Sequence, residues 1–137
     1  MATASKRDLM LAAAKARQRA VAPFSNFKVG AALLTKRGEI IAGANVESAS
    51  FGLTCCAERV ALFNALTGGK TNFVALAIVA RVPAGPMPCG ACRQLLAEYA
   101  SNARIWVADS RALQAVKEFS VSELLPGAFL EVPAEAD

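Results

Sequence analysis

Apolar residues near the start of the chain recur at the spacing of an α-helix. They fall at positions i, i+3, i+4 and i+7 of one helical face: Leu9, Ala12, Ala13 and Ala16. Ser5 and Asp8 form the pattern of a capping box before this run, and Pro23 follows Val21, where the periodic pattern stops. We therefore expect a helix that begins after Ser5 and ends near Val21.

Two short apolar runs follow, and a polar tripeptide separates them. Residues 27–35 (FKVGAALLT) and 39–46 (EIIAGANV) flank Lys36-Arg37-Gly38, which predicts an antiparallel hairpin. After a polar loop, Thr54 is a candidate cap for a helix that runs to Leu66. The glycine pair that follows ends this helix.

The second half of the chain alternates strands and helices. Residues 73–80 (FVALAIVA) are continuously apolar, as expected of a strand that is buried on both faces. A proline-rich loop then leads into a helix from Cys89 to Tyr99, and residues 104–108 form the next strand. An edge strand and a short helix over 122–125 complete the pattern. This order predicts a layered α/β fold in one domain over residues 1–137.

The composition changes this picture mainly by what it excludes. No apolar run approaches the length of a membrane span, although 55% of the residues are hydrophobic. Lys15, Arg17 and Arg19 interrupt the N-terminal apolar segment before it reaches the length of a signal peptide, so we expect a cytoplasmic protein. The net charge of +4 is spread along the chain, and it indicates neither a nucleic acid nor a membrane as partner.

The chain contains no histidine. This excludes Ser-His-Asp and Cys-His catalytic arrangements and every zinc site that depends on histidine. It has four cysteines, and in a reducing cytoplasm these are expected to bind a metal or to react rather than to form disulfides. A metal site must therefore be built from cysteine and carboxylate side chains.

Three of the cysteines form the outline of a zinc site. Cys89 and Cys92 are close together at the start of a predicted helix, so their side chains project from one face. Cys56 lies near the start of another predicted helix, where unsatisfied backbone N–H groups favour a thiolate. Three protein ligands leave a zinc position open for water, as in catalytic sites, whereas a structural site needs a fourth ligand. Cys55 is the only spare thiol, and because neighbouring helical residues point about 100° apart, it is poorly placed to join Cys56. The residues alone do not choose between the two kinds of site.

Charged residues accompany these cysteines. Glu58 is two residues past Cys56, where it is a candidate proton carrier beside the open zinc position. Arg59 follows Glu58 and Arg93 follows Cys92, and a cation is expected to stabilise a negative cluster of three thiolates. Arg59 is the better candidate for this role, although on an ordinary helix all three residues would be surface charges.

The motifs belong to a longer set that resembles the small zinc-dependent cytidine deaminases of pyrimidine salvage. The matching segments extend over nearly the whole chain: 22–25 (APFS) with Phe27, 29–32 (VGAA), 45–47 (NVE), 56–59 (CAER), 88–94 (PCGACRQ) and 124–129 (LLPGAF). The resemblance implies a three-layer fold whose central mixed sheet of about five strands has helices on both faces. It also implies one Zn²⁺ per subunit, a nucleoside substrate and a homotetramer.

The resemblance further implies a reaction and its catalytic residues. Cytidine and 2'-deoxycytidine would be hydrolysed to uridine and 2'-deoxyuridine with release of ammonia. Zinc would be bound by Cys56, which stands where many members have histidine, and by Cys89 and Cys92. A zinc-bound hydroxide would attack C4 of cytosine while Glu58 transfers the protons, as is known for zinc deaminases as a class.

The nucleoside contacts are also implied by resemblance. The residues concerned are Phe27 beside the pyrimidine, Asn45 and Glu47 at the ribose hydroxyls, the Ala57 backbone at the base carbonyl, and Phe51 and Phe129 across a subunit contact. Two positions depart from the usual family pattern, Ser48 and Cys55. The preference between ribose and deoxyribose stays open.

Three other functions are weighed against this one. A polynucleotide base deaminase shares the zinc and the glutamate but needs a groove with basic and aromatic residues, and this chain has one Trp and one Tyr. The carboxylate of Glu47 also suits a free sugar better than a phosphate. A nucleoside-antibiotic deaminase is a nearer alternative, although residues 45–47 argue against it. A zinc-stabilised module without activity would contain metal but leave cytidine unchanged.

Overall fold

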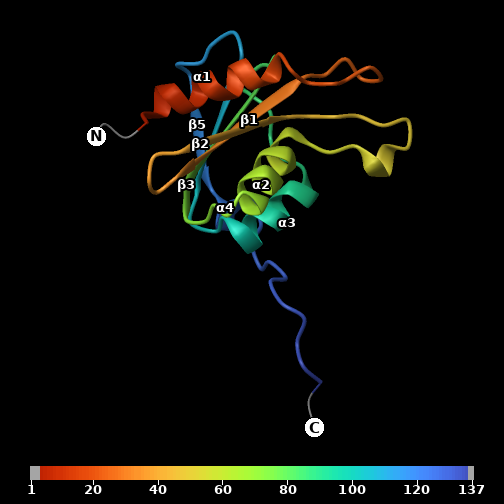
Figure 1. The fold of residues 1–137 in the computed structure, drawn as a ribbon, viewed down its shortest axis with the longest axis vertical. Coiled ribbons are helices and arrows are strands. Elements are labelled where there is room, and N and C mark those ends of the chain that lie inside the picture. Colours follow the sequence, from red (N-terminus) through yellow and green to blue (C-terminus); the bar gives the residue numbers. More distant parts are fainter. Residues whose placement is uncertain (1–3, 136–137) are drawn as a thin grey trace.

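The computed structural model describes residues 4–135, and their core is a five-stranded mixed sheet (Figure 1). The strand order is β2-β1-β3-β4-β5, in which β3 and β4 are parallel and the other neighbours are antiparallel. The strands are β1 (Val29–Thr35), β2 (Ile40–Ala44), β3 (Phe73–Ala80), β4 (Arg104–Asp109) and β5 (Lys117–Ser120). The helices are α1 (Lys6–Arg17), the short 3₁₀ helix Phe51–Leu53, α2 (Ala57–Thr67), α3 (Gly90–Tyr99) and α4 (Val121–Leu124).

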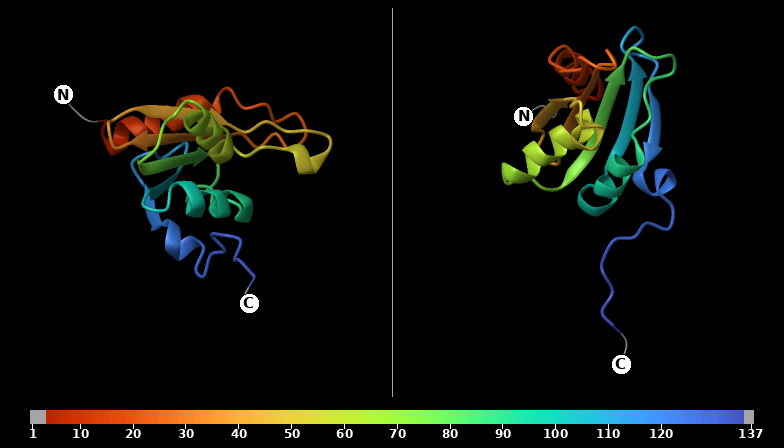
Figure 2. Two further views of the ribbon diagram at one scale, coloured as in Figure 1. Left: turned by 60° about the horizontal axis from the view of Figure 1, so that its bottom comes forward. Right: turned by 90° about the vertical axis from the view of Figure 1, so that its right-hand side faces the viewer.

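Helices cover both faces of the sheet, which confirms the predicted three-layer α/β fold (Figures 1 and 2). Side chains of β3 alternate between two hydrophobic cores, as the period of a strand requires. Leu76 and Ile78 belong to the core formed with α2 and α3, whereas Ala77 and Val79 belong to the core formed with α1. The continuous apolar run of this strand is thus explained by burial on both sides.

Glycines allow two helices to lie directly on the hairpin of β1 and β2. A Cβ atom added at Gly43 would lie 2.5 Å from the backbone nitrogen of Ala61 in α2. A Cβ atom at Gly30 would overlap the backbone oxygen of Ala13 in α1. A side chain at either position would therefore push a helix away from the sheet.

The predicted strands and helices are confirmed, but two helix ends were placed wrongly. The first helix begins with the predicted Ser5 capping box but ends at Arg17 rather than near Val21. Val21 instead pairs with a distant segment, because its N–H donates to Asn45 O and its C=O accepts from Glu47 N, both at 2.9 Å. These long-range hydrogen bonds outweigh the local helical pattern.

Thr54 does not cap α2, which was the second error. Its Oγ1 accepts a hydrogen bond from Ser48 N at 3.0 Å, and Cys56 occupies the N-cap position of the helix. The helix ends at the glycine pair as predicted, with Gly68 at the C-cap. Within residues 4–135, no helix combines the length and the apolar character that crossing a membrane requires.

One end of the sheet gathers the segments that the sequence analysis singled out. Because β1 is antiparallel to both of its neighbours, Val29 pairs with Ala80 at the end of β3, and Gly30 pairs with Ala44 at the end of β2. The segments that precede β1, follow β2 and follow β3 therefore lie together at one end of the sheet. Figure 1 shows the first two of these segments projecting beyond the sheet.

Candidate metal centre and substrate cavity

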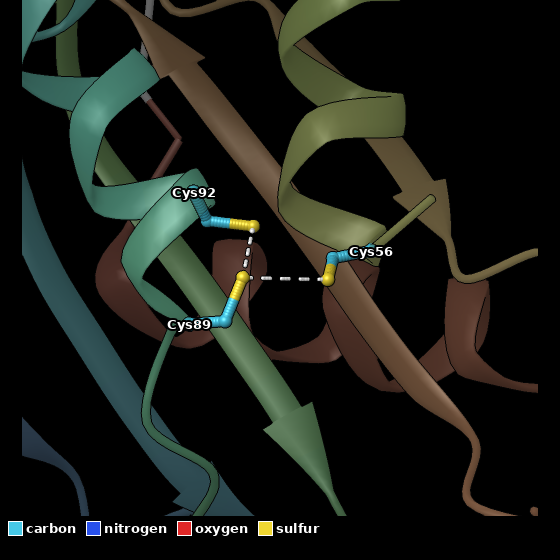
Figure 3. A group of neighbouring side chains, drawn as sticks. All are labelled: Cys56, Cys89 and Cys92. Atoms are coloured by element: carbon cyan, nitrogen blue, oxygen red, sulfur yellow. Dashed lines mark hydrogen bonds between the residues drawn. The ribbon is translucent and has the colours of Figure 1, made fainter. Parts of the chain in front are cut away.

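Three cysteine sulfurs converge at the N-termini of two helices (Figure 3). Cys56 is the N-cap of α2, Cys89 is the N-cap of α3, and Cys92 lies in the first turn of α3. The Sγ of Cys89 lies 3.7 Å from the Sγ of Cys56 and 3.5 Å from that of Cys92. All three sulfur atoms lie within 4.8 Å of one another.

This spacing fits a zinc ion. Zn–S bonds of about 2.3 Å in tetrahedral geometry place two sulfur ligands roughly 3.8 Å apart, close to the two Sγ–Sγ distances in the structure. The partial positive charge at the N-terminus of α2 favours a thiolate at Cys56. The donor set and the spacing are therefore those of a zinc site with three protein ligands.

Cys55 stands apart from this group, although it is adjacent to Cys56 in the chain. Its backbone pairs with that of Val46, and burial raises the pKa of its thiol. Among residues 4–135, the cluster of potential metal ligands contains the three other cysteines and not Cys55. Cys55 is therefore not placed to be the fourth ligand of a zinc ion bound by the other three cysteines.

Arg59 faces the sulfur of Cys56. Its Nη2 lies 3.5 Å from Sγ of Cys56 and also donates to the C=O of Thr54 at 3.3 Å. Hydrogen bonds from the Cys92 thiol and from Arg59 lower the pKa of Cys56 to about 5. Arg93 instead donates to the C=O groups of Pro88 and Leu124, at 2.8 and 3.0 Å, so it braces the backbone rather than the thiols.

Glu58 is buried beside the metal centre. It is the second residue of α2, and only 5% of its surface is exposed. Burial raises the pKa of its carboxyl to about 7, and the negative charge of Cys56 acts in the same direction. A carboxyl group with a pKa near neutrality can both accept and release a proton at pH 7.

A cavity of about 240 Å³ connects the metal centre with residues that sequence analysis assigned to the substrate. Its lining includes two of the zinc-site cysteines, Glu58 and four of the six predicted substrate contacts: Cys56, Cys89, Glu58, Phe27, Asn45, Glu47 and Ala57. Residues from the ends of three strands and two helices thus surround one space.

Sequence analysis assigned several other residues of the cavity wall to neither the metal nor the substrate. These are Ser25, Val29, Thr54, Ile78, Pro86 and Met87. Ser25 and Val29 lie within the motif segments 22–25 and 29–32 that carry the resemblance, so the sequence offered grounds to place them at the site. Pro86 and Met87 belong to the loop after β3, whose composition predicts only that it is a loop.

Asn45 holds the segment that carries Phe27. Its Nδ2 donates to Phe27 O at 2.9 Å, and its Oδ1 accepts from Val29 N at 2.8 Å. The side chain is buried, and the Nδ2 group still has a second hydrogen to donate. Asn45 therefore fixes the entrance to β1 and retains a donor.

Phe51 and Phe129 lie outside this cavity. Phe51 is 79% exposed and lines a neighbouring cavity of about 320 Å³ together with Ser25 and Glu47. Phe129 is 63% exposed, and its C=O accepts a hydrogen bond from Nε2 of Gln94 in α3 at 2.6 Å. Neither ring lines the metal-centred cavity of its own chain.

The chain is similar to known proteins along most of its length. Residues 3–108 match the family model described as the cytidine and deoxycytidylate deaminase zinc-binding region. A cytidine deaminase from Halalkalibacterium halodurans is 48% identical over 125 residues, which cover 90% of this chain and 93% of that protein. A cytidine deaminase from Sporosarcina psychrophila is 45% identical over 115 residues, 84% of each chain.

The fold is similar to that of a solved structure as well. The crystal structure of cytidine deaminase from Burkholderia pseudomallei matches with a TM-score of 0.87 and 44% sequence identity. The match covers 91% of this chain and 99% of that chain. Similarity in sequence and in fold therefore extends well beyond the cysteine motifs.

Proposed function

The chain belongs to the zinc-dependent cytidine deaminases, and we propose that it hydrolyses both cytidine and 2'-deoxycytidine in the cavity at its metal centre. Cys56, Cys89 and Cys92 bind the zinc. The observation that supports the proposal most strongly is that one cavity joins this centre, the buried Glu58 and the residues assigned to the sugar.

Glu58 is the proton carrier of the proposed reaction. When bound, zinc supplies a Lewis acid that turns water into a nucleophile at neutral pH. Glu58 would take a proton from the water that adds to C4 and deliver it to N3 of the pyrimidine. It would then carry the proton of the new C4 hydroxyl to the amino group, so that ammonia leaves and C4 becomes a carbonyl. A pKa of about 7, caused mainly by burial, suits a carboxyl group to transfers in both directions.

The other cavity residues orient the nucleoside. The ring of Phe27 packs beside the pyrimidine, and the backbone of Ala57 contacts the base carbonyl. Asn45 donates its free Nδ2 hydrogen to the sugar, and Glu47 accepts from a sugar hydroxyl. Because a carboxylate repels phosphate, Glu47 favours a free nucleoside over a nucleotide or a strand of DNA or RNA.

A comparison of substrates tests this function. Zinc-loaded protein is mixed with cytidine, 2'-deoxycytidine, a single-stranded oligonucleotide that contains cytosine, or a cytosine nucleoside antibiotic, and the ultraviolet absorbance is followed. We expect rapid turnover of the two nucleosides only. Turnover of the oligonucleotide or the antibiotic alone would support the corresponding alternative, and zinc-loaded protein without turnover would support a non-enzymatic module.

We also propose that the protein is a homotetramer whose subunits complete one another's cavities with Phe51 and Phe129. Large apolar side chains are exposed in the 3₁₀ helix and along the C-terminal segment: Phe51, Leu53, Phe129, Leu130 and Val132. Clustered exposed apolar residues are typical of protein interfaces. The exposed positions of the two rings, outside the cavity of their own chain, support a role in a neighbouring subunit.

Mixing two inactive variants tests this arrangement. Glu58→Gln subunits lack the proton carrier, and Phe129→Ala subunits lack the ring. If Phe129 acts on a neighbouring site, random tetramers of the two should regain roughly a quarter of the wild-type sites. No recovery, or a light-scattering mass other than about four times the 14.3 kDa chain, would contradict the assembly.

The proposed location is the cytoplasm. No disulfide joins any two of the four cysteines, all of which lie among the described residues, and Cys55 lies outside the cluster of zinc ligands. Thiols of this kind persist in a reducing compartment. Cell fractionation with an antibody to the protein tests this placement.

A further inference from the structure

Ser25 links the carboxylate of Glu47 to the backbone of Phe27. The Ser25 hydroxyl donates to Oε2 of Glu47 and accepts from the N–H of Phe27 at 3.0 Å. The backbone N–H groups of Phe24 and Ser25 both donate to Oε1 of Glu47 at 3.0 Å. Three donors from one turn therefore hold a carboxylate that lies 22 positions later in the chain.

These hydrogen bonds define which part of Glu47 is free. A carboxylate has about four lone-pair positions, two on each oxygen. Both positions on Oε1 are used by backbone donors, and one position on Oε2 is used by Ser25. The remaining position on Oε2 is the one available to a sugar hydroxyl. The same hydrogen bonds, led by that from Ser25, lower the pKa of Glu47 and keep it ionised.

The Ser25 hydroxyl is the part of this arrangement that can be removed by substitution. Glu47 is only partly buried, and no ion pair among residues 4–135 includes it. Without the hydroxyl, Oε2 would lose its donor and the carboxylate could rotate about its last bond. The N–H of Phe27 would lose its acceptor at the same time.

Both residues also border the substrate cavity. Ser25 and Glu47 line the cavity of about 240 Å³ and the adjoining cavity of about 320 Å³ that contains Phe51. The ring of Phe27 lines the first cavity and is 43% exposed. Movement of the Ser25 turn would therefore displace the groups proposed for the sugar and for the base together.

We propose that Ser25 is a positioning residue for nucleoside recognition: its hydroxyl fixes Oε2 of Glu47 and the backbone of Phe27 in the orientation that receives the sugar. This inference rests on the proposed function, which assigns Glu47 to a ribose hydroxyl. Ser25 has no part in the proton transfers, so its loss should weaken substrate binding more than the chemical step.

A double-mutant cycle with two substrates tests the inference. Ser25→Ala, Glu47→Ala and the double variant are assayed with cytidine and with 2',3'-dideoxycytidine, which lacks the 2'- and 3'-hydroxyls. We expect Ser25→Ala to raise KM for cytidine about tenfold with little change in kcat. In the Glu47→Ala background, or with 2',3'-dideoxycytidine, the same substitution should raise KM by about threefold or less, because only the effect through Phe27 then remains. Ser25→Thr, which keeps a hydroxyl, should restore KM toward the wild-type value.

The outcomes separate this inference from the function on which it rests. Equal losses with both substrates, or full additivity with Glu47→Ala, would show a merely structural role and overturn it. A wild-type KM in Ser25→Ala beside an impaired Glu47→Ala would overturn the role of Ser25 alone. A wild-type KM in Glu47→Ala would overturn the sugar assignment as well. Thermal unfolding identifies folding defects, and Ser25→Cys, with a weaker hydrogen-bonding group of similar shape, serves as a second variant.

Discussion

The Nη2 of Arg59, in the first turn of α2, lies 3.5 Å from the Sγ of Cys56, the N-cap residue of the same helix. Three thiolates and one Zn²⁺ sum to a single negative charge, whereas a neutral histidine in place of Cys56 would make the sum zero. Arg59 supplies a positive charge where the extra thiolate places a negative one, and it donates a hydrogen bond to the sulfur. We therefore propose that Arg59 compensates for the negative charge that a cysteine adds at this ligand position.

Replacing Arg59 with glutamine should weaken zinc binding. The substitution removes the charge, and loss of a group that supports a metal ligand typically costs about 10- to 100-fold in metal affinity. Competition with a chromogenic chelator measures this change. Arg104→Gln is the control, because Arg104 pairs with Glu118 and begins β4 at the other end of the sheet from the metal centre. Equal zinc affinity in the two variants would contradict the role of Arg59.

Cys55 and Cys92 should differ sharply in their importance for zinc. Cys55→Ser should retain one zinc per chain, because Cys55 lies outside the cluster of ligands. Cys92→Ser should lose most of its zinc, because a serine hydroxyl at this buried position does not ionise as a thiol does. Elemental analysis of the purified variants measures zinc per chain. Zinc loss in Cys55→Ser with retention in Cys92→Ser would reverse the assignment.

The packing of α2 on the hairpin should depend on Gly43. Gly43→Ala places a Cβ atom 2.5 Å from the nitrogen of Ala61, so the helix that carries Glu58 must shift. Overpacking of this kind costs about 1–3 kcal/mol of unfolding free energy, which urea unfolding of the zinc-loaded protein measures. Gly52→Ala is the matched control, since no atom lies within 4 Å of its added Cβ. Equal unfolding free energies for the two variants would contradict the claim that the packing of α2 requires a glycine at position 43.

Local patterns predicted the parts of the fold that local interactions determine. Residues 73–80 form a strand with the predicted bounds, because their apolar run requires burial on both faces. Ser5 and Asp8 form the predicted capping box, because both of its hydrogen bonds join residues three positions apart. Cys89 and Cys92 are a local pair as well, and the motif around them identified them as ligands.

Features that depend on distant contacts were not predicted from the sequence. The predicted end of α1 was wrong because Val21 pairs with residues 45–47, which follow the second strand of the hairpin. The role of Ser25 follows only when the turn that contains it meets Glu47. Met87, in the loop after β3, lines the cavity, although no periodicity or motif marks its position. Such contacts arise from chain topology, which single-sequence patterns do not encode.

The central claim is that a three-thiolate zinc centre and the buried Glu58 together deaminate cytidine, and one paired measurement on Glu58→Gln tests it most directly. Zinc per chain and kcat for cytidine are determined on the same preparations of variant and wild type. Glutamine keeps the shape of the side chain but carries no transferable proton. We therefore expect one zinc per chain in both proteins and a kcat for the variant that is lower by about 100- to 10,000-fold. Full turnover by Glu58→Gln, or turnover by wild-type protein that contains no metal, would contradict the account.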